Sequence, residues 1–202
     1  MSGSPSRVVL ATRNQHKIRE LARILAPYDV ELVDWPDLPD VAETGTTFAE
    51  NALLKARAIA SLTGLVAVAD DSGLTVDALN GMPGVLSARW AGRHGDDAAN
   101  LGLVLAQLAD VPDERRTAAF VCAAAAVSPS GAELVVEGRV DGVLLHAARG
   151  DGGFGYDPIF VPAGESRTTA EMSADEKDAL SHRGKAFRAL APRLAGLLDT
   201  VQ

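Results

Sequence analysis

Apolar side chains near the start of the chain follow two different spacings. Residues 7–11 and 30–33 are short, mostly apolar runs, which are typical of buried strands. Between them, apolar positions recur every three or four residues and predict a helix that ends before Pro27. These helical positions are Ile18, Leu21, Ala22 and Leu25. The pattern therefore predicts a strand, a helix and a second strand.

A capping pattern marks the next helix. Thr47, followed three residues later by Glu50, is typical of a helix N-terminus. It predicts a helix over residues 48–62, which Gly64 would close. Residues 65–69 then form a short apolar run that is typical of a buried strand.

Two adjacent carboxylates follow this central run. Because Ser72-Gly73 is a turn signal, we expect Asp70 and Asp71 to lie where the strand ends. Ligands of open α/β sheets gather at the carboxyl ends of strands, and carboxylates there can hold Mg²⁺. Successive strand residues point to opposite faces, so the two acids should have different roles. The alternative is that both simply cap a turn or a helix.

The second half of the chain is expected to contain both a strand hairpin and further helices. Residues 117–127 and 133–140, separated by a Pro-Ser-Gly turn, predict an antiparallel hairpin. Further elements are expected from apolar runs, helical spacing and a capping pattern at Ser173. They are a helix after Asp96 or Asp97, strands at 143–145 and 159–161, and helices ending at 180 and running over 182–198. The fold class is α/β with a mixed sheet.

Composition narrows the class of protein. The 202 residues suit one domain, 1–202, with residues 1–6 as a flexible tail. A formal net charge of −8 argues against a nucleic-acid polymer as the main partner. We expect no membrane association, because residues 1–6 resemble no secretory signal and no run is long enough to span a bilayer. A single cysteine, Cys122, suits the reducing cytoplasm.

Residues 12–17, Thr-Arg-Asn-Gln-His-Lys, lie between the first strand and the first helix. A helix N-terminus offers unpaired N–H groups and a positive dipole end, which favour phosphate, and Lys17 would add a charge. The alternative is an ordinary helix cap by Thr12 or Asn14 with a solvated lysine.

Two later stretches could contact a flat ring. Residues 150–158 contain four glycines that allow close backbone approach, and Phe154 and Tyr156 could stack on a base. His182 and Arg183 donate hydrogen bonds and, with Lys177, could favour a 6-keto over a 6-amino purine. The alternatives are a tight turn with two core aromatics, and a solvated helix end.

Six short motifs occur in order along the chain. They are Thr12-x-Asn14-x-x-Lys17, Phe48-x-Glu50-Asn51-Ala52-x-x-Lys55-Ala56, Ala69-Asp70-Asp71-Ser72-Gly73-Leu74, Gly81-x-Pro83-Gly84-x-x-Ser87-Ala88-Arg89, Gly152-Gly153-Phe154-Gly155-Tyr156-Asp157-Pro158 and Ser181-His182-Arg183-Gly184. Together they resemble the Ham1 family, the inosine triphosphate pyrophosphatases, over about residues 8–198. The resemblance implies Mg²⁺-dependent hydrolysis of XTP, ITP and dITP to the monophosphate and pyrophosphate. It also implies a homodimer and an elongated mixed β-sheet flanked by helices, with two lobes around a central substrate cleft.

The resemblance further implies roles for single residues. Asp71 would bind Mg²⁺ and act as the base for the attacking water, with Asp70 assisting. The phosphates would be held by Thr12, Arg13, Asn14, Gln15, His16 and Lys17. Substrate contacts would come from Ser72, and base contacts from Phe154, Gly155, Tyr156, Asp157, Lys177, His182 and Arg183.

One position departs from the family pattern. Relatives often have two acids before the Thr-Gly of the early loop, but here Ala42 takes the first position and Glu43 alone remains as a second metal ligand. Two other functions stay open. One is a Maf-type pyrophosphatase acting on modified pyrimidine nucleotides, and the other is a nucleotide-binding protein without catalysis. His182 and Arg183 could explain rejection of ATP but not of GTP, which shares the 6-keto group.

Overall fold

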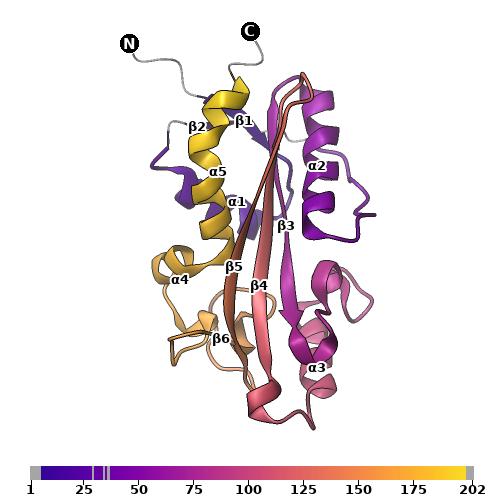
Figure 1. Ribbon diagram of the computed structural model, residues 1–202, viewed down its shortest axis with the longest axis vertical. Helices are drawn as coiled ribbons and strands as arrows, with labels where there is room; N and C mark the ends of the chain where they lie inside the picture. Colours follow the sequence, from indigo (N-terminus) through magenta and orange to yellow (C-terminus); the bar gives the residue numbers. More distant parts are fainter. Residues whose placement is uncertain (1–5, 29, 34, 36, 199–202) are drawn as a thin grey trace. The chain divides into compact units, whose positions relative to one another are not determined.

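The computed structural model describes residues 6–28, 30–33, 35 and 37–198, which contain a six-stranded open sheet in the order β2-β1-β3-β4-β5-β6 (Figure 1). The strands are β1 (Ser6–Leu10), β2 (Val30–Val33), β3 (Val66–Val76), β4 (Thr117–Val127), β5 (Glu133–Leu144) and β6 (Phe160–Pro162). β1 pairs in parallel with β2 and β3, whereas β5 and β6 pair antiparallel. The predicted mixed α/β sheet is therefore confirmed.

The predicted hairpin is formed by β4 and β5, neighbours joined by a short turn in which Ser128 N donates to Ala132 O at 2.9 Å. A connection this short requires antiparallel strands. The separate strand predicted at 143–145 is wrong, because β5 continues to Leu144 and uses Val143 to pair with Val161 of β6.

The chain forms two compact units. The first holds the described residues up to Asp71, Cys122–Gly138 and the chain from Arg183 onward. The second holds Ser72–Val121 and Arg139–His182. β1 begins at Ser6, the last residue of the expected tail, and the rest of that tail lies outside the described residues. No helix in the described part of the chain is long and apolar enough to cross a membrane.

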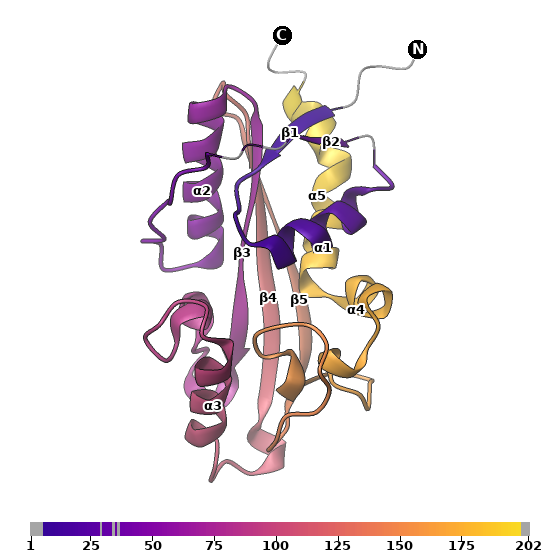
Figure 2. The ribbon, with the colours of Figure 1, turned by 180° about the vertical axis from the view of Figure 1, so that it is seen from behind.

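In the first unit, helices cover both faces of the sheet (Figures 1 and 2). α1 (Gln15–Leu25) and α5 (His182–Leu198) pack on one face, and α2 (Phe48–Thr63) packs on the other. Strand alternation separates the two cores. On β3, Val66 and Val68 belong to the core with α1 and α5, whereas Ala67 and Ala69 belong to the core with α2.

The capping signals of α2 are confirmed. Thr47 and Glu50 form a complete capping box, and Gly64 closes the helix in the left-handed conformation with φ 65°. These caps fix both ends of the helix, and residues three or four positions apart then lie on the one face that packs on the sheet.

The second unit has its own core and contains α3 (Asp97–Gln107) and α4 (Ala174–Leu180). Asp96 caps α3, and Ser173 and Glu176 form the capping box of α4, both as predicted. Phe120 and Phe160 pack edge to face at 4.6 Å between ring centroids. Arg116 is buried, and its guanidinium donates to the carbonyl oxygens of Leu108, Leu144 and Leu145.

The predicted end of the central strand at the aspartates is wrong, because β3 continues through Asp70, Asp71, Ser72 and Gly73 to Val76. A Cβ on Gly73 would lie 2.3 Å from Ser87 Oγ and 2.6 Å from Gly84 O. Ser87 Oγ also accepts a hydrogen bond from Leu74 N at 2.9 Å. The glycine serves a close approach of another segment rather than a turn, which is the other common reason for glycine inside a strand.

Candidate active site

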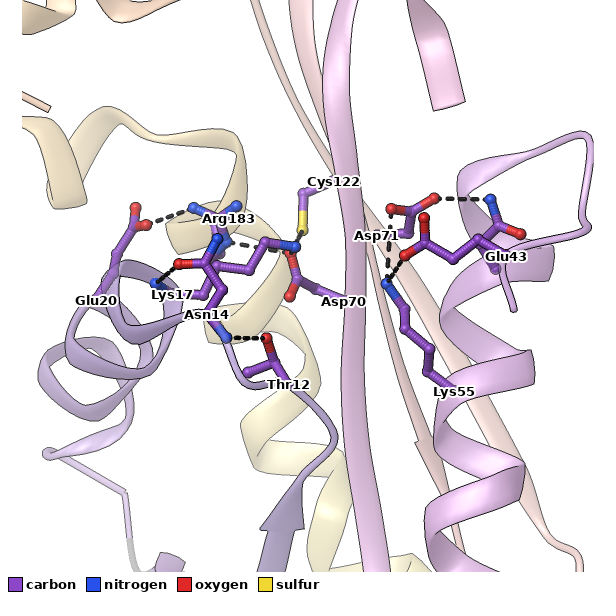
Figure 3. A network of polar contacts seen from close by, with 11 residues as sticks. Thr12, Asn14, Lys17, Glu20, Glu43, Lys55, Asp70, Asp71, Cys122 and Arg183 are labelled. Carbon is purple, nitrogen blue, oxygen red and sulfur yellow. Dashed lines mark hydrogen bonds and ion pairs between the residues drawn. The ribbon is translucent and has the colours of Figure 1, made fainter. Parts of the chain in front are cut away.

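Alternation along β3 sends the two central carboxylates to opposite faces of the sheet, as predicted (Figure 3). Asp70 continues the face of Val66 and Val68 and meets side chains from α1 and α5. Asp71 continues the face of Ala67 and Ala69 and meets side chains from α2. Both are buried, at 2% and 6% exposure.

Asp70 is held by two cations. Its Oδ2 atom lies 2.8 Å from Lys17 Nζ and 3.2 Å from Arg183 Nε. Arg183 Nη1 also donates to Glu20 of α1, so a buried guanidinium links two buried carboxylates. Burial by itself would raise the pKa of Asp70, but the charges of Lys17, Arg183 and Lys55 outweigh it and hold the pKa well below the usual range. Asp70 is therefore a permanent negative charge.

Asp71 has a different environment. Its Oδ2 atom accepts from Asn51 Nδ2 at 3.0 Å, and its Oδ1 atom lies 3.6 Å from Lys55 Nζ. Burial raises the pKa of Asp71, nearby Glu43 adds to this, and the attraction of Lys55 only partly opposes it. The environments of the two aspartates thus push their pKa values apart.

The amide of Asn51 is oriented by the early loop. Asn51 Oδ1 accepts from Gly45 N at 2.8 Å, which leaves its Nδ2 to donate to Asp71. The same loop supplies Glu43, whose Oε1 atom lies 2.8 Å from Lys55 Nζ. One ammonium therefore contacts both carboxylates predicted as metal ligands.

The donor set of Asp71 and Glu43 fits Mg²⁺. This ion prefers hard oxygen ligands and is commonly bound by one or two carboxylates together with substrate phosphates and water. Among the described residues, no group of three or more His, Cys, Asp or Glu side chains could hold a metal ion. The residues present would therefore supply part of a Mg²⁺ coordination shell, and phosphates would complete it.

Residues 12–17 include a helix cap, one of the two roles considered for them. Asn14 Oδ1 accepts from Lys17 N at 3.2 Å and so caps α1, whereas Thr12 Oγ1 accepts from Asn14 N at 3.2 Å in the turn just before the helix. Lys17 is not a solvated lysine but reaches Asp70. Arg13 pairs with Asp40 in an exposed ion pair. The side chains of Gln15 and His16 lie outside the described residues.

In the second unit, Asp157 organises the glycine-rich loop. Its Oδ2 atom accepts from Phe154 N at 2.8 Å and Lys177 Nζ at 2.7 Å, and its Oδ1 atom accepts from Thr169 Oγ1 at 2.9 Å. Lys177 Nζ also lies over the Phe154 ring, 4.7 Å from its centroid. Asp157 therefore positions both Phe154 and Lys177.

The other predicted base contacts are placed differently. Tyr156 is a core aromatic, 4% exposed, whose hydroxyl donates to Ser87 O at 2.9 Å, and burial raises its pKa. Gly155 N donates to Asp97 Oδ2 at 2.9 Å. Ser72 is half-buried on β3. His182 stacks on Phe120 with 4.9 Å between ring centroids.

A small, open hollow lies within this unit. Its apolar wall includes Phe120, Val140, Phe160, Pro162 and Leu180, and its polar groups are Asp157, Thr169, Lys177, Ser181 and His182. Asp157, Lys177 and His182 are thus brought together, whereas Arg183 turns to Asp70 in the first unit.

Sequence reasoning assigned no role to Asn51, Lys55 or Glu20. Asn51 and Lys55 are four residues apart on α2, so they share one helix face, and both are polar on a face that packs on the sheet. Glu20 follows Lys17 by three residues on α1 and is 3% exposed. Polar residues at helical spacing among core positions were the signal that could have found them.

Comparisons with known proteins agree on one family. Residues 8–193 match the sequence profile of the Ham1 family. A dITP/XTP pyrophosphatase from Streptomyces coelicolor is 64% identical over 198 residues, covering 96% of this chain and 99% of the relative. One from Frankia alni is 63% identical over 201 residues, covering 96% of this chain and all (100%) of the relative.

Solved structures agree with the sequence relatives. The crystal structure of a nucleoside-triphosphatase, dITP/XTP pyrophosphatase, from Mycobacterium abscessus is 60% identical with a TM-score of 0.76, covering 92% of this chain and 99% of that one. A HAM1 protein from Coxiella burnetii is 42% identical with a TM-score of 0.86, covering 94% and 98%. The chain therefore belongs to the Ham1 family.

Proposed function

We propose that this protein is a nucleoside triphosphate pyrophosphatase that hydrolyses the non-canonical purine nucleotides XTP, ITP and dITP. The products are the nucleoside monophosphate and pyrophosphate, so the enzyme would remove deaminated purines from the nucleotide pool. The names of the relatives, dITP/XTP pyrophosphatases from Streptomyces coelicolor and Frankia alni, support this substrate class.

The observation that carries the proposal is the divided environment of Asp70 and Asp71. A pair of acids whose pKa values are pushed apart is typical of a catalytic site in which one group moves a proton and the other stays charged. Asp71 would accept the proton of the attacking water; a cation held beside it would lower its pKa, so acidification of the bound water would contribute more than the basicity of the carboxylate. Asp70 would remain ionised and hold Lys17 in place.

In the proposed reaction, the water oxygen bonds to the α-phosphorus and the bond from that phosphorus to the α–β bridging oxygen breaks. Pyrophosphate leaves with the electron pair of that bond. Asp71 and Glu43 would hold Mg²⁺, which when bound offsets phosphate charge and acidifies water. Lys17 and the N-terminus of α1 would stabilise charge on the phosphates.

Base contacts are assigned to the second unit. Phe154 would stack on the ring, and Lys177 and His182, which line the hollow around Asp157, would donate hydrogen bonds to its carbonyl groups. Arg183 and the other predicted substrate contacts, Thr12, Arg13, Asn14, Gln15, His16, Ser72, Gly155 and Tyr156, stay predictions. Cytoplasmic location is proposed with them, because Cys122 is a buried free thiol.

Pyrophosphate release from a panel of nucleotides tests the function. XTP, ITP, dITP, ATP, GTP and dTTP would be compared with Mg²⁺ and then with a chelator. The expected result is fast release from the first three, almost none from ATP and GTP, and loss of release on chelation. Activity mainly on dTTP would favour a Maf-type enzyme. Binding of XTP without turnover would favour a non-catalytic nucleotide-binding protein.

A further inference from the structure

Lys55 occupies a critical place beside the proposed metal ligands. It projects from α2, its side chain is 13% exposed, and its Nζ atom lies 2.8 Å from Glu43 Oε1 and 3.6 Å from Asp71 Oδ1 (Figure 3). The ammonium thus contacts the same two oxygen-bearing groups that a divalent cation would use. If the Lys55 ammonium stayed in its present place, it would repel at short range a divalent cation bound to both carboxylates.

The charges of Asp71, Glu43 and Lys55 indicate what a divalent cation would still lack at this place. Asp71 and Glu43 together with Lys55 leave one net negative charge, which is a weak field for a divalent ion. The protein also contributes too few acidic or histidine ligands to close a coordination shell by itself within the described residues. Triphosphate oxygens supply both the missing ligands and the missing negative charge.

We propose that Lys55 is a competing internal cation that makes divalent metal binding conditional on the nucleotide. While Lys55 bridges Glu43 and Asp71, a divalent ion without nucleotide would bind poorly. The oxygen atoms of a triphosphate would supply further ligands, and its negative charge would draw the ammonium away from the carboxylates. Lys55 is in this sense a positioning residue. The inference rests on the proposed function for the identity of the metal ligands.

Binding of Mn²⁺ alone, followed by electron paramagnetic resonance and calorimetry without nucleotide, tests the inference. Mn²⁺ replaces Mg²⁺ as a spectroscopic probe, and all variants are compared at the same pH. Lys55→Met should bind Mn²⁺ about tenfold or more tightly than the wild type, because a cation at contact distance is removed. Lys55→Arg keeps the charge and should bind as the wild type does.

Two further variants locate the effect. Arg57→Met removes an exposed cation two residues along the same helix, where Arg57 pairs with Glu133, and should leave Mn²⁺ affinity unchanged. Adding Asp71→Asn to Lys55→Met should cancel the gain, since the gain depends on that carboxylate.

Equal or weaker Mn²⁺ binding by Lys55→Met would overturn the inference. If this variant does not fold, Lys55→Gln, which keeps an N–H donor for Glu43, is used instead. Failure of both to fold would also overturn it, because Lys55 would then be a structural tie. A negative nucleotide panel refutes the proposed function, whereas the Mn²⁺ comparison needs no turnover and fails or succeeds separately.

Discussion

Asp70 and Asp71 are neighbours in sequence, yet their charges satisfy different groups. Asp70 is shared by Lys17 and Arg183, both largely buried, whereas Asp71 accepts from Asn51 and faces Lys55. Lys55 keeps Glu43 as a partner when Asp71 is neutralised. The two side chains should therefore respond differently to the same substitution.

Asp71→Asn should lower kcat by about 10²–10⁴-fold, the usual range for loss of a proton-transfer group. The free energy of unfolding should stay close to wild type. Asp70→Asn should instead lower the free energy of unfolding by about 3–5 kcal/mol, because it leaves buried cations without their shared carboxylate. Steady-state kinetics and urea unfolding of both variants check this. Equal loss of stability in the two would contradict the division of roles.

At the scale of the element, β3 depends on Gly73 for the approach of Ser87 and Gly84. Gly73→Ala should lower the free energy of unfolding by about 1–3 kcal/mol, since the added methyl group overpacks a tight contact. Gly102→Ala in α3 is the matched control: its Cβ would meet nothing within 4 Å, so helix propensity should stabilise it by about 0.5–1 kcal/mol. Urea unfolding of both variants measures their free energies of unfolding. A Gly73→Ala variant as stable as the wild type would refute the close approach.

The capping box of α4 should give a pH dependence. Pairing with Arg167 and hydrogen bonds from Ser173 lower the pKa of Glu176 to about 2 from an ordinary 4.5. Because the folded state has the lower pKa, its stabilisation is present above pH 4.5 and is lost as pH falls through about 2. Glu176→Gln should reduce the dependence of the free energy of unfolding on pH between about pH 2 and pH 4.5. Asp175→Asn, on the same helix but outside the capping box, should not.

At the scale of the whole molecule, we propose a homodimer, as the family resemblance implies. Light scattering after size exclusion should then give about twice the 21.0 kDa of one chain, independent of dilution in the micromolar range. A mass that remains at that of one chain would remove the dimer from the proposal while leaving the catalytic residues untouched.

Local signals predicted most elements well because their causes are local. Capping boxes at Thr47 and Ser173 and the left-handed Gly64 are satisfied by atoms a few residues away, so the bounds of α2 and α4 could be read from the chain. The end of β3, in contrast, could not be predicted from the sequence. Whether glycine makes a turn or admits a neighbour depends on Ser87, thirteen positions beyond Leu74 in the hydrogen bond that joins them.

The sequence by itself determined the family, the mixed α/β class and the opposed faces of Asp70 and Asp71, because motif order and strand alternation are properties of the chain. Only the tertiary structure decided which cation meets which acid. Lys17, Arg183 and Glu20 gather on one face of β3, and Asn51, Lys55 and Glu43 on the other. Those partners come from distant segments, and burial strengthens the interactions between charges, so the pKa shifts of Asp70 and Asp71 exist only once the sheet and helices have packed.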